Sequence, residues 1–136
     1  MKYVTEDEML ILASDYARHM ERDAVLCLVG DLGSGKTAFV RMLCSKLGIE
    51  GTVSSPSFTI LNIYEGATKI YHFDFYRLSA FEDLEEIGFF DIIEKPGIKI
   101  IEWPEIALDF LRDYNAKIIK FYFDEEQPDK RGILFE

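Results

Sequence analysis

The sequence of 136 residues has few cysteines, few prolines and few basic residues. It holds two cysteines and four prolines, and its 15 lysines and arginines are outnumbered by 25 aspartates and glutamates, which gives a net charge of −10. Such an excess of negative charge disfavours a broad contact with the phosphate backbone of a nucleic acid. We therefore expect any link to DNA or RNA to pass through a partner protein.

The spacing of the cysteines and the lack of long apolar runs indicate in which cellular compartment the protein is found. Cys27 and Cys44 do not have the spacing of a metal site, and we interpret both as reduced, buried thiols. No apolar run approaches the roughly 18 residues of a membrane span, and the N-terminus is acidic where a signal peptide is basic. We expect a cytoplasmic protein that makes no membrane contact.

What the sequence does have is enough apolar material for one core. Hydrophobic residues make up 49% of the chain and aromatic residues 14%. A chain of this length has room for one hydrophobic core, so we expect a single domain over residues 1–136.

The most informative segment is the octapeptide Gly30-Asp31-Leu32-Gly33-Ser34-Gly35-Lys36-Thr37. Residues 24–29 before it are typical of a buried strand, and residues 38–47 after it have apolar residues at helical spacing. The glycines allow several backbone N–H groups to face a polyphosphate. Lys36 would contact the β- and γ-phosphate oxygens, and the Thr37 hydroxyl would bind Mg²⁺. The segment predicts binding of a nucleoside triphosphate.

Other signals give the order of the elements. Thr5 and Glu8 form a capping-box pattern that predicts a helix ending near Arg22. Residues 58–64 and 69–76 predict an antiparallel hairpin directly after the first α/β unit. A second capping box, Ser79 to Glu82, predicts a short acidic helix that ends at Gly88. Further strands are predicted over residues 98–101, 116–124 and 131–136.

Two acidic residues are candidates for holding Mg²⁺ or its waters together with Thr37. Glu102 follows the predicted strand 98–101, at the end where open α/β sheets bind ligands. Asp74 lies among aromatic residues in a strand-like segment, where an unpaired charge is costly. The alternative interpretations are an exposed carboxylate for Glu102 and an ion pair with Arg77 for Asp74.

Three other features near these acids admit two interpretations each. The polar loop before the hairpin is either a connector or a switch loop that responds to the γ-phosphate through Ser55, Ser57 and Thr59. Trp103, directly after Glu102, is either a site residue or a packing residue. His72 alternates with apolar residues, which favours a structural histidine over a catalytic base.

Several separated strings together resemble the TsaE family, the small bacterial ATPases of tRNA threonylcarbamoyladenosine (t6A) biosynthesis. The resemblance rests on the octapeptide Gly30 to Thr37, Ser55-Pro56-Ser57-Phe58-Thr59, His72-Phe73-Asp74-Phe75-Tyr76-Arg77-Leu78, Glu85-Glu86-Ile87-Gly88 with Asp91, and Glu102-Trp103-Pro104-Glu105. It extends from the first strand of the α/β unit to past Glu105. Two positions depart from the family pattern: Ser57 and Ala38 stand where the family usually has threonine.

The resemblance implies a fold class, ligands and partners. The fold is an α/β P-loop NTPase three-layer sandwich, with a mostly parallel sheet and an inserted antiparallel β-hairpin. The implied ligands are ATP and Mg²⁺, and the implied activity is a weak ATPase that depends on partners. Those partners are the TsaB and TsaD proteins, which transfer threonylcarbamoyl to adenosine 37 of tRNA. The chain would then reach tRNA only indirectly, and we expect it to be a monomer on its own.

The resemblance also implies roles for individual residues. Lys36 holds phosphate, Thr37 and Glu102 hold Mg²⁺, and Asp74 is needed for hydrolysis or coupling. The residues expected to contact the nucleotide are Asp31, Leu32, Gly33, Ser34, Gly35, Lys36, Thr37, Ala38 and Trp103.

Two other classes of P-loop protein fit the sequence less well. A small-molecule kinase usually has a lid with several arginines, whereas the arginines Arg41, Arg77, Arg112 and Arg131 are scattered singly. A GTPase-type switch protein carries an Asn-Lys-x-Asp string that recognises guanine, and the sequence has none. No arginine is evidently placed to stabilise a transition state, although Arg41 and Arg77 stay candidates.

Overall fold

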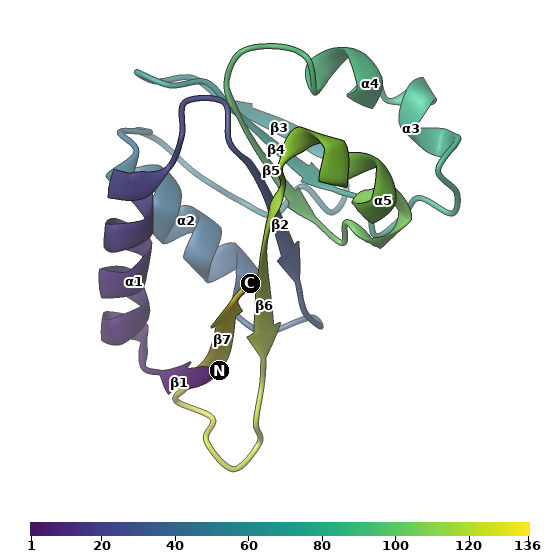
Figure 1. Cartoon of the computed structure of the whole chain (residues 1–136). Coiled ribbons are helices and arrows are strands. Elements are labelled where there is room, and N and C mark those ends of the chain that lie inside the picture. The colour runs from purple at the N-terminus through teal and green to yellow at the C-terminus, as the bar shows by residue number, and fades with distance from the viewer.

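A mixed sheet of seven strands forms the centre of the chain in a computed structural model that describes residues 1–136 (Figure 1). The strand order is β1-β7-β6-β2-β5-β4-β3. The four central strands β6, β2, β5 and β4 are parallel, and antiparallel strands flank them on both sides. The strands are β1 (Lys2–Val4), β2 (Val25–Val29), β3 (Leu61–Tyr64), β4 (Ile70–Asp74), β5 (Ile98–Glu102), β6 (Lys117–Tyr122) and β7 (Arg131–Phe135).

Helices cover both faces of the sheet, as Figure 1 shows. Helices α1 (Glu6–His19) and α2 (Lys36–Lys46) lie on one face. Short helices α3 (Asp83–Glu86), α4 (Phe89–Ile92) and α5 (Leu108–Leu111) lie on the other. Single 3₁₀ turns at Glu105–Ala107 and Arg112–Tyr114 flank α5. The chain therefore has three layers, with the sheet in the middle.

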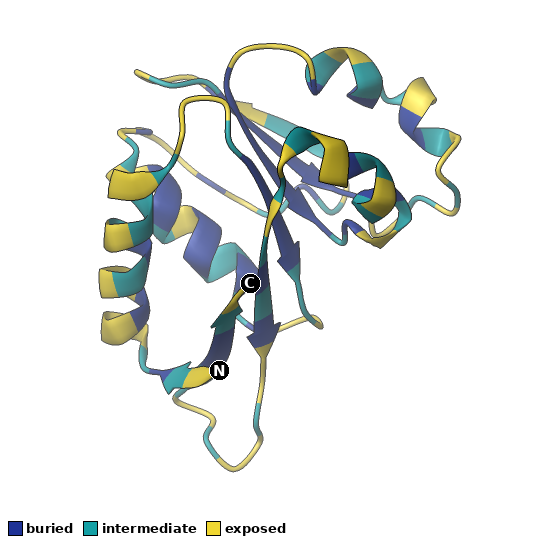
Figure 2. Cartoon of the chain, viewed as in Figure 1, coloured by how far each residue is buried: buried dark blue, intermediate teal, exposed yellow.

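Two hydrophobic cores fill the spaces between these layers, and strands β4 and β5 are buried along their whole length (Figure 2). Alternate residues of one strand serve opposite cores: Leu26 of β2 packs toward α1 and α2, while Cys27 packs toward the short helices. Burial on both faces explains why β2 is continuously apolar in sequence. Both cysteines are buried and unpaired, as predicted.

Several local predictions are confirmed. The capping box at the start of α1 is present: the Glu8 amide donates to the Thr5 hydroxyl at 3.3 Å, and the Thr5 amide donates to the Glu8 carboxylate at 2.9 Å. The helix ends at His19, somewhat before the expected Arg22. The predicted hairpin is the antiparallel pair β3 and β4. Its second strand also pairs in parallel with β5, so the hairpin is part of the main sheet.

The second predicted capping box is wrong. Helix α3 begins only at Asp83. The side chain of Glu82, the residue before it, makes no capping hydrogen bond. The Asp83 carboxylate instead accepts from the amides of Ser79 and Ala80, at 3.0 and 3.1 Å. The Ser79 amide, which a capping box would pair with the Glu82 carboxylate, thus donates to the carboxylate one residue later.

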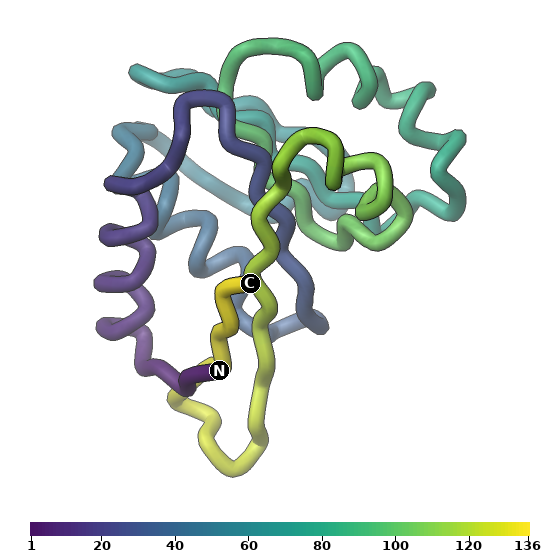
Figure 3. The backbone as a smooth tube through the Cα atoms, in the orientation of Figure 1, coloured from purple at the N-terminus to yellow at the C-terminus, as the bar shows by residue number.

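Strand β1 and helices α4 and α5 were not predicted from the sequence. Strand β1 pairs with β7, which brings the two ends of the chain side by side (Figure 3). None of the helices has the length and apolar character required to cross a membrane.

Candidate functional site

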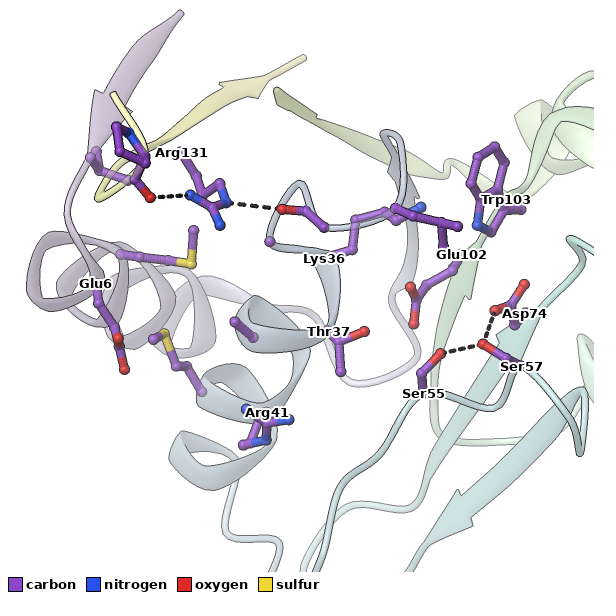
Figure 4. A pocket seen from close by; sticks show the side chains of 18 of the residues that line it. Glu6, Lys36, Thr37, Arg41, Ser55, Ser57, Asp74, Glu102, Trp103 and Arg131 are labelled. Carbon is purple, nitrogen blue, oxygen red and sulfur yellow. Dashed lines mark hydrogen bonds between the residues drawn. The ribbon is translucent and has the colours of Figure 1, made fainter. Parts of the chain in front are cut away.

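A cleft of about 560 Å³ lies at the carboxyl ends of β2 and β5, beside the first turn of α2 (Figure 4). Most of the residues predicted from the sequence line it: Leu32, Gly33, Gly35, Lys36, Thr37, Ala38, Ser55, Ser57, Asp74, Glu102 and Trp103. Three of the predicted residues, Asp31, Ser34 and Thr59, are not among its lining residues. A volume of this size is in the range of small-molecule sites.

The loop of residues 30–35 connects β2 to α2 and has a backbone that only glycine accommodates at two points. Gly35 has a φ of +108°, in the region that side chains disfavour. A Cβ on Gly30 would lie 2.7 Å from the Phe121 carbonyl oxygen. The Ser34 hydroxyl is buried and donates to the Asp31 carbonyl at 2.6 Å. Ser34 therefore shapes the loop from within, although the sequence suggested that it contacts a ligand.

The start of α2 presents unused backbone donors to the cleft. No side chain caps the helix at Gly35. The first amide to bond back is that of Phe39, which donates to the Gly35 carbonyl at 3.0 Å. The amides of residues 35–38 before it are therefore free to donate to an anion, and the positive end of the helix dipole adds to the attraction.

Lys36 holds the positive charge of the site in a buried position. Its side chain is only 5% exposed, its ammonium group donates to the Gly30 carbonyl, and its Nζ lies 4.0 Å from the centre of the Trp103 ring. Burial lowers the pKa of Lys36, while the nearby carboxylates of Glu102 and Asp74 oppose that shift. The ammonium group is thus held by one carbonyl and one aromatic face, both of which a phosphate could replace.

Trp103 follows β5 with a φ of +53°, an unusual value for a residue other than glycine. Its indole ring lies beside the Lys36 ammonium and packs on Tyr76 with ring centres 4.7 Å apart. Trp103 therefore lines the cleft in addition to its packing role.

Asp74 and Glu102 end two adjacent parallel strands and lie opposite each other in the register. Asp74 is 4% exposed, and it accepts from the Tyr76 amide at 2.8 Å and from the Ser57 hydroxyl at 3.3 Å. Burial raises the pKa of Asp74, and the negative charge of Glu102 adds to the rise.

Both alternative interpretations of these acids are wrong. Asp74 forms no ion pair with Arg77, whose guanidinium lies 5.8 Å from the centre of the Phe58 ring. Glu102 is only 2% exposed, so it is not a solvated carboxylate at a strand end. Its Oε2 lies 2.6 Å from Nε2 of the buried His72. His72 is a fully hydrogen-bonded core residue, as its sequence pattern indicated.

The polar loop before β3 contributes two of its three predicted residues. The hydroxyls of Ser55 and Ser57 lie 2.8 Å apart, and Ser57 continues the chain of hydrogen bonds to Asp74. Figure 4 shows both serines beside Asp74, with the side chain of Thr37 directed toward them. Thr59 is exposed and donates to Asn62 at 2.8 Å. Its hydroxyl therefore supports the turn into β3 and does not line the cleft.

Arg131 lines the cleft although no sequence pattern indicated it. Its Nε donates to the Gly33 carbonyl at 3.0 Å, and its guanidinium lies 4.5 Å from the centre of the Phe123 ring. The contact joins the start of β7 to a loop 98 residues earlier, so no local pattern could reveal it. The same end of the cleft is also lined by residues without a sequence signal: Val4, Glu6, Met9, Met42, Pro128 and Asp129.

The chain is similar to one family of known proteins. The family model described as "Threonylcarbamoyl adenosine biosynthesis protein TsaE" matches residues 3–133. The tRNA threonylcarbamoyladenosine biosynthesis protein TsaE of Bacillus subtilis is 32% identical over 133 residues, which cover 97% of this chain and 81% of that protein. The protein of the same name from Aquifex aeolicus is 38% identical over 128 residues, covering 87% and 91%.

A third relative of that name, from Treponema pallidum, is 40% identical over 101 residues, which cover 74% of this chain and 75% of the relative. Among solved structures, the crystal structure of Bacillus subtilis YdiB superposes with a TM-score of 0.66 at 29% sequence identity. The superposition covers 98% of this chain and 84% of YdiB.

Proposed function

The chain belongs to the TsaE family, and we propose that it is a Mg²⁺-dependent ATPase that serves the t6A modification of tRNA. The relatives are named as t6A biosynthesis proteins, which supports a role in that pathway. One observation carries the ATPase proposal: the Gly30–Thr37 loop and two buried carboxylates face each other across one cleft. We assign the three-layer fold to the P-loop NTPases on the same ground.

In this proposal the loop binds the phosphates of ATP. The free amides of residues 35–38 donate to phosphate oxygens, and the Lys36 ammonium exchanges the Gly30 carbonyl for a phosphate. Leu32 is 75% exposed at the tip of the loop, where it can close over the ligand. The adenosine then extends toward the end of the cleft formed by Met9, Met42 and Pro128, which offers apolar surface for a base.

The donor set in the cleft suits Mg²⁺ bound together with a nucleotide. No group of three or more His, Cys, Asp or Glu side chains could hold a metal by itself. Mg²⁺ instead takes oxygen ligands and keeps several waters, with phosphates supplying some of its positions. The Thr37 hydroxyl and the Glu102 carboxylate are the protein oxygens we assign to it, directly or through water. When bound, the ion would neutralise charge that develops on the phosphate oxygens.

The carboxylates have separate roles in the proposed hydrolysis. Glu102, at the end of β5, orients the ion and its waters. Asp74 is hydrogen-bonded to Ser57. A change in the position of the polar loop can therefore move the Asp74 carboxylate relative to the reacting phosphate. Arg41, on α2, lines the cleft, whereas Arg77 does not. Without a dedicated arginine directed at the phosphate, turnover by the chain alone is expected to be slow.

The proposed partners are the TsaB and TsaD proteins, with tRNA reached through them, in the cytoplasm. A surface with a net charge of −10 suits docking on a protein better than docking on tRNA. The test is a phosphate-release assay with the chain alone and with TsaB and TsaD, combined with quantification of t6A in tRNA. We expect slow ATP turnover that rises with the partners, and t6A formation that requires the chain. Equal amounts of ADP and phosphate would separate hydrolysis from transfer to a small-molecule acceptor.

A further inference from the structure

Two buried side chains connect Glu102 to the loop that precedes β3. Nε2 of His72 lies 2.6 Å from Oε2 of Glu102, and Nδ1 of His72 lies 3.0 Å from the hydroxyl of Tyr64. The Tyr64 hydroxyl also donates to the carbonyl of Ser54, at 3.0 Å. His72 is fully buried and Tyr64 is 8% exposed. The connection therefore runs through the protein interior, from the cleft to the loop backbone.

The strand register places these side chains on one face of the sheet. His72 is two residues before Asp74 on β4, and Asp74 lies opposite Glu102 on β5. His72 and Glu102 are thus diagonal neighbours on the same face, within reach of each other's polar atoms. Tyr64 on β3 pairs with Ile70, two residues before His72, which makes it the diagonal neighbour on the other side. This face is the one that α1 and α2 cover.

The hydrogen bonds restrict the torsions of the Glu102 side chain. A glutamate has three side-chain torsions, and its carboxylate can point in several directions unless a partner holds it. His72 engages Oε2, so Oε1 is the oxygen left for the cleft. The histidine ring is itself fixed, because its other nitrogen contacts Tyr64. Partners of this kind orient groups that bind metals, and their loss typically reduces activity about 10- to 100-fold.

The loop end of the connection is equally well anchored. The Ser54 carbonyl accepts from Tyr64 and also from the Asn62 side chain, at 3.0 and 3.2 Å. The next residues of the loop are Ser55 and Ser57, which line the cleft and lead to Asp74. The same loop is therefore hydrogen-bonded to one carboxylate through serine hydroxyls and to the other through Tyr64 and His72.

We propose that His72 and Tyr64 are positioning residues that fix the Glu102 carboxylate in the cleft and couple it to residues 54–57. The inference rests on the proposed ATPase function for its kinetic consequences, but the connection itself can be tested without nucleotide. Movement of the loop breaks the Tyr64–Ser54 bond and releases the histidine ring, which changes the orientation of Glu102. The loop can thus control hydrolysis through the orientation of the Glu102 carboxylate.

The kinetic test compares Tyr64→Phe with Tyr71→Phe. Each substitution deletes one hydroxyl from a nearly buried tyrosine, and Tyr71 faces the opposite core, away from the cleft. We expect Tyr64→Phe to lower kcat with little change in the affinity for ATP measured by calorimetry, and Tyr71→Phe to retain both. Equal kcat values for the two variants would overturn the proposal.

Variants of His72 test the path to Glu102. We expect His72→Leu to lower kcat about 10- to 100-fold and His72→Gln, which can still donate toward Glu102, to recover part of that loss. In a Glu102→Gln background, His72→Leu is expected to cause no further decrease, because both act through one group. Independent, multiplied losses would show that His72 acts elsewhere, for example on packing alone.

A spectroscopic readout separates this inference from the ATPase proposal. The chain has two histidines, and His19 is exposed. In nitrogen-15 spectra of the protein without nucleotide, we expect a slowly exchanging imidazole N–H signal from His72 that is lost in His72→Gln and retained in His19→Gln. Tyr64→Phe should shift this signal and accelerate its exchange. A signal that is absent or unaffected by Tyr64→Phe would contradict the connection, whereas a connection with no ATP turnover would contradict only the proposed function.

Discussion

The ammonium group of Lys36 lies 4.0 Å from the centre of the indole ring of Trp103. Trp103 is the single tryptophan of the chain, so all tryptophan fluorescence comes from this place in the cleft. We expect Lys36→Met to change the emission of Trp103 without any nucleotide, because the cation leaves the face of the ring. Titration of the unsubstituted protein with ATP and Mg²⁺ should produce a saturable change as Lys36 moves toward phosphate. Identical emission of the two proteins would show that the contact is not populated in solution.

Substitutions of Thr37 test the assignment of the metal. The nucleotide affinity measured with Mg²⁺ is expected to exceed the affinity measured after a chelator has removed the metal. Thr37→Ala deletes the hydroxyl and should abolish most of this difference, since the affinity for the nucleotide without metal depends on the loop amides. Thr37→Ser keeps the oxygen and should keep the Mg²⁺ dependence. Calorimetric titrations of both variants, with and without Mg²⁺, provide the comparison. A Thr37→Ala protein with unchanged Mg²⁺ dependence would remove Thr37 from the metal site.

Glu102→Gln tests the role of the strand-end carboxylate. The substitution keeps the shape of the side chain and an oxygen that can accept from His72, but it removes the charge. We expect nucleotide binding to persist and kcat to fall by a factor on the order of 100 or more. Single-turnover measurements would separate binding from the chemical step. Hydrolysis at the unsubstituted rate would transfer the metal role to Asp74.

The raised pKa of Asp74 predicts a pH-dependent effect on stability. Burial, the largest cause, raises the pKa of this carboxyl in the folded state, so its ionised form costs stability at neutral pH. Asp74→Asn should therefore increase the free energy of unfolding at pH 7. As the pH falls through the raised folded pKa toward the ordinary carboxyl range near about 3.9, the native aspartate takes up a proton and the advantage should shrink.

Chemical denaturation of both proteins across this pH range measures that difference, and other titrating groups cancel between them. An advantage that grows as the pH decreases would contradict the predicted direction. The same variant should also hydrolyse ATP more slowly if Asp74 takes part in hydrolysis or coupling.

The sequence predicted those parts of the fold that depend on local patterns. The Thr5–Glu8 capping box, the strand–loop–helix unit around residues 30–37 and the hairpin of β3 and β4 all follow from spacings within a few residues. The capping box of Ser79 and Glu82 did not form because the Ser79 amide donates to the carboxylate of Asp83 and not to that of Glu82. Local patterns show which groups can form a bond, but not which of two competing acceptors will.

The candidate site likewise contains residues that local patterns predict and residues that they do not. Lys36, Thr37, Asp74 and Glu102 could be recognised by residue type and position in the chain, and the structure brings them to one cleft. The bond from Arg131 to Gly33 and the one from His72 to Glu102 span 98 and 30 residues. Such contacts depend on the order of the strands in the sheet, which the spacing of apolar residues within one strand does not encode. The residues that support the site were therefore visible only in three dimensions.

The most direct test of the central claim is a calorimetric titration of the chain with a non-hydrolysable ATP analogue in the presence of Mg²⁺. A single site should appear for the unsubstituted protein, and Lys36→Met should weaken it about 10- to 100-fold, which corresponds to the loss of a hydrogen bond to a charged group. No heat of binding with the unsubstituted protein, or equal affinities for the two proteins, would contradict the assignment of the loop and cleft to ATP.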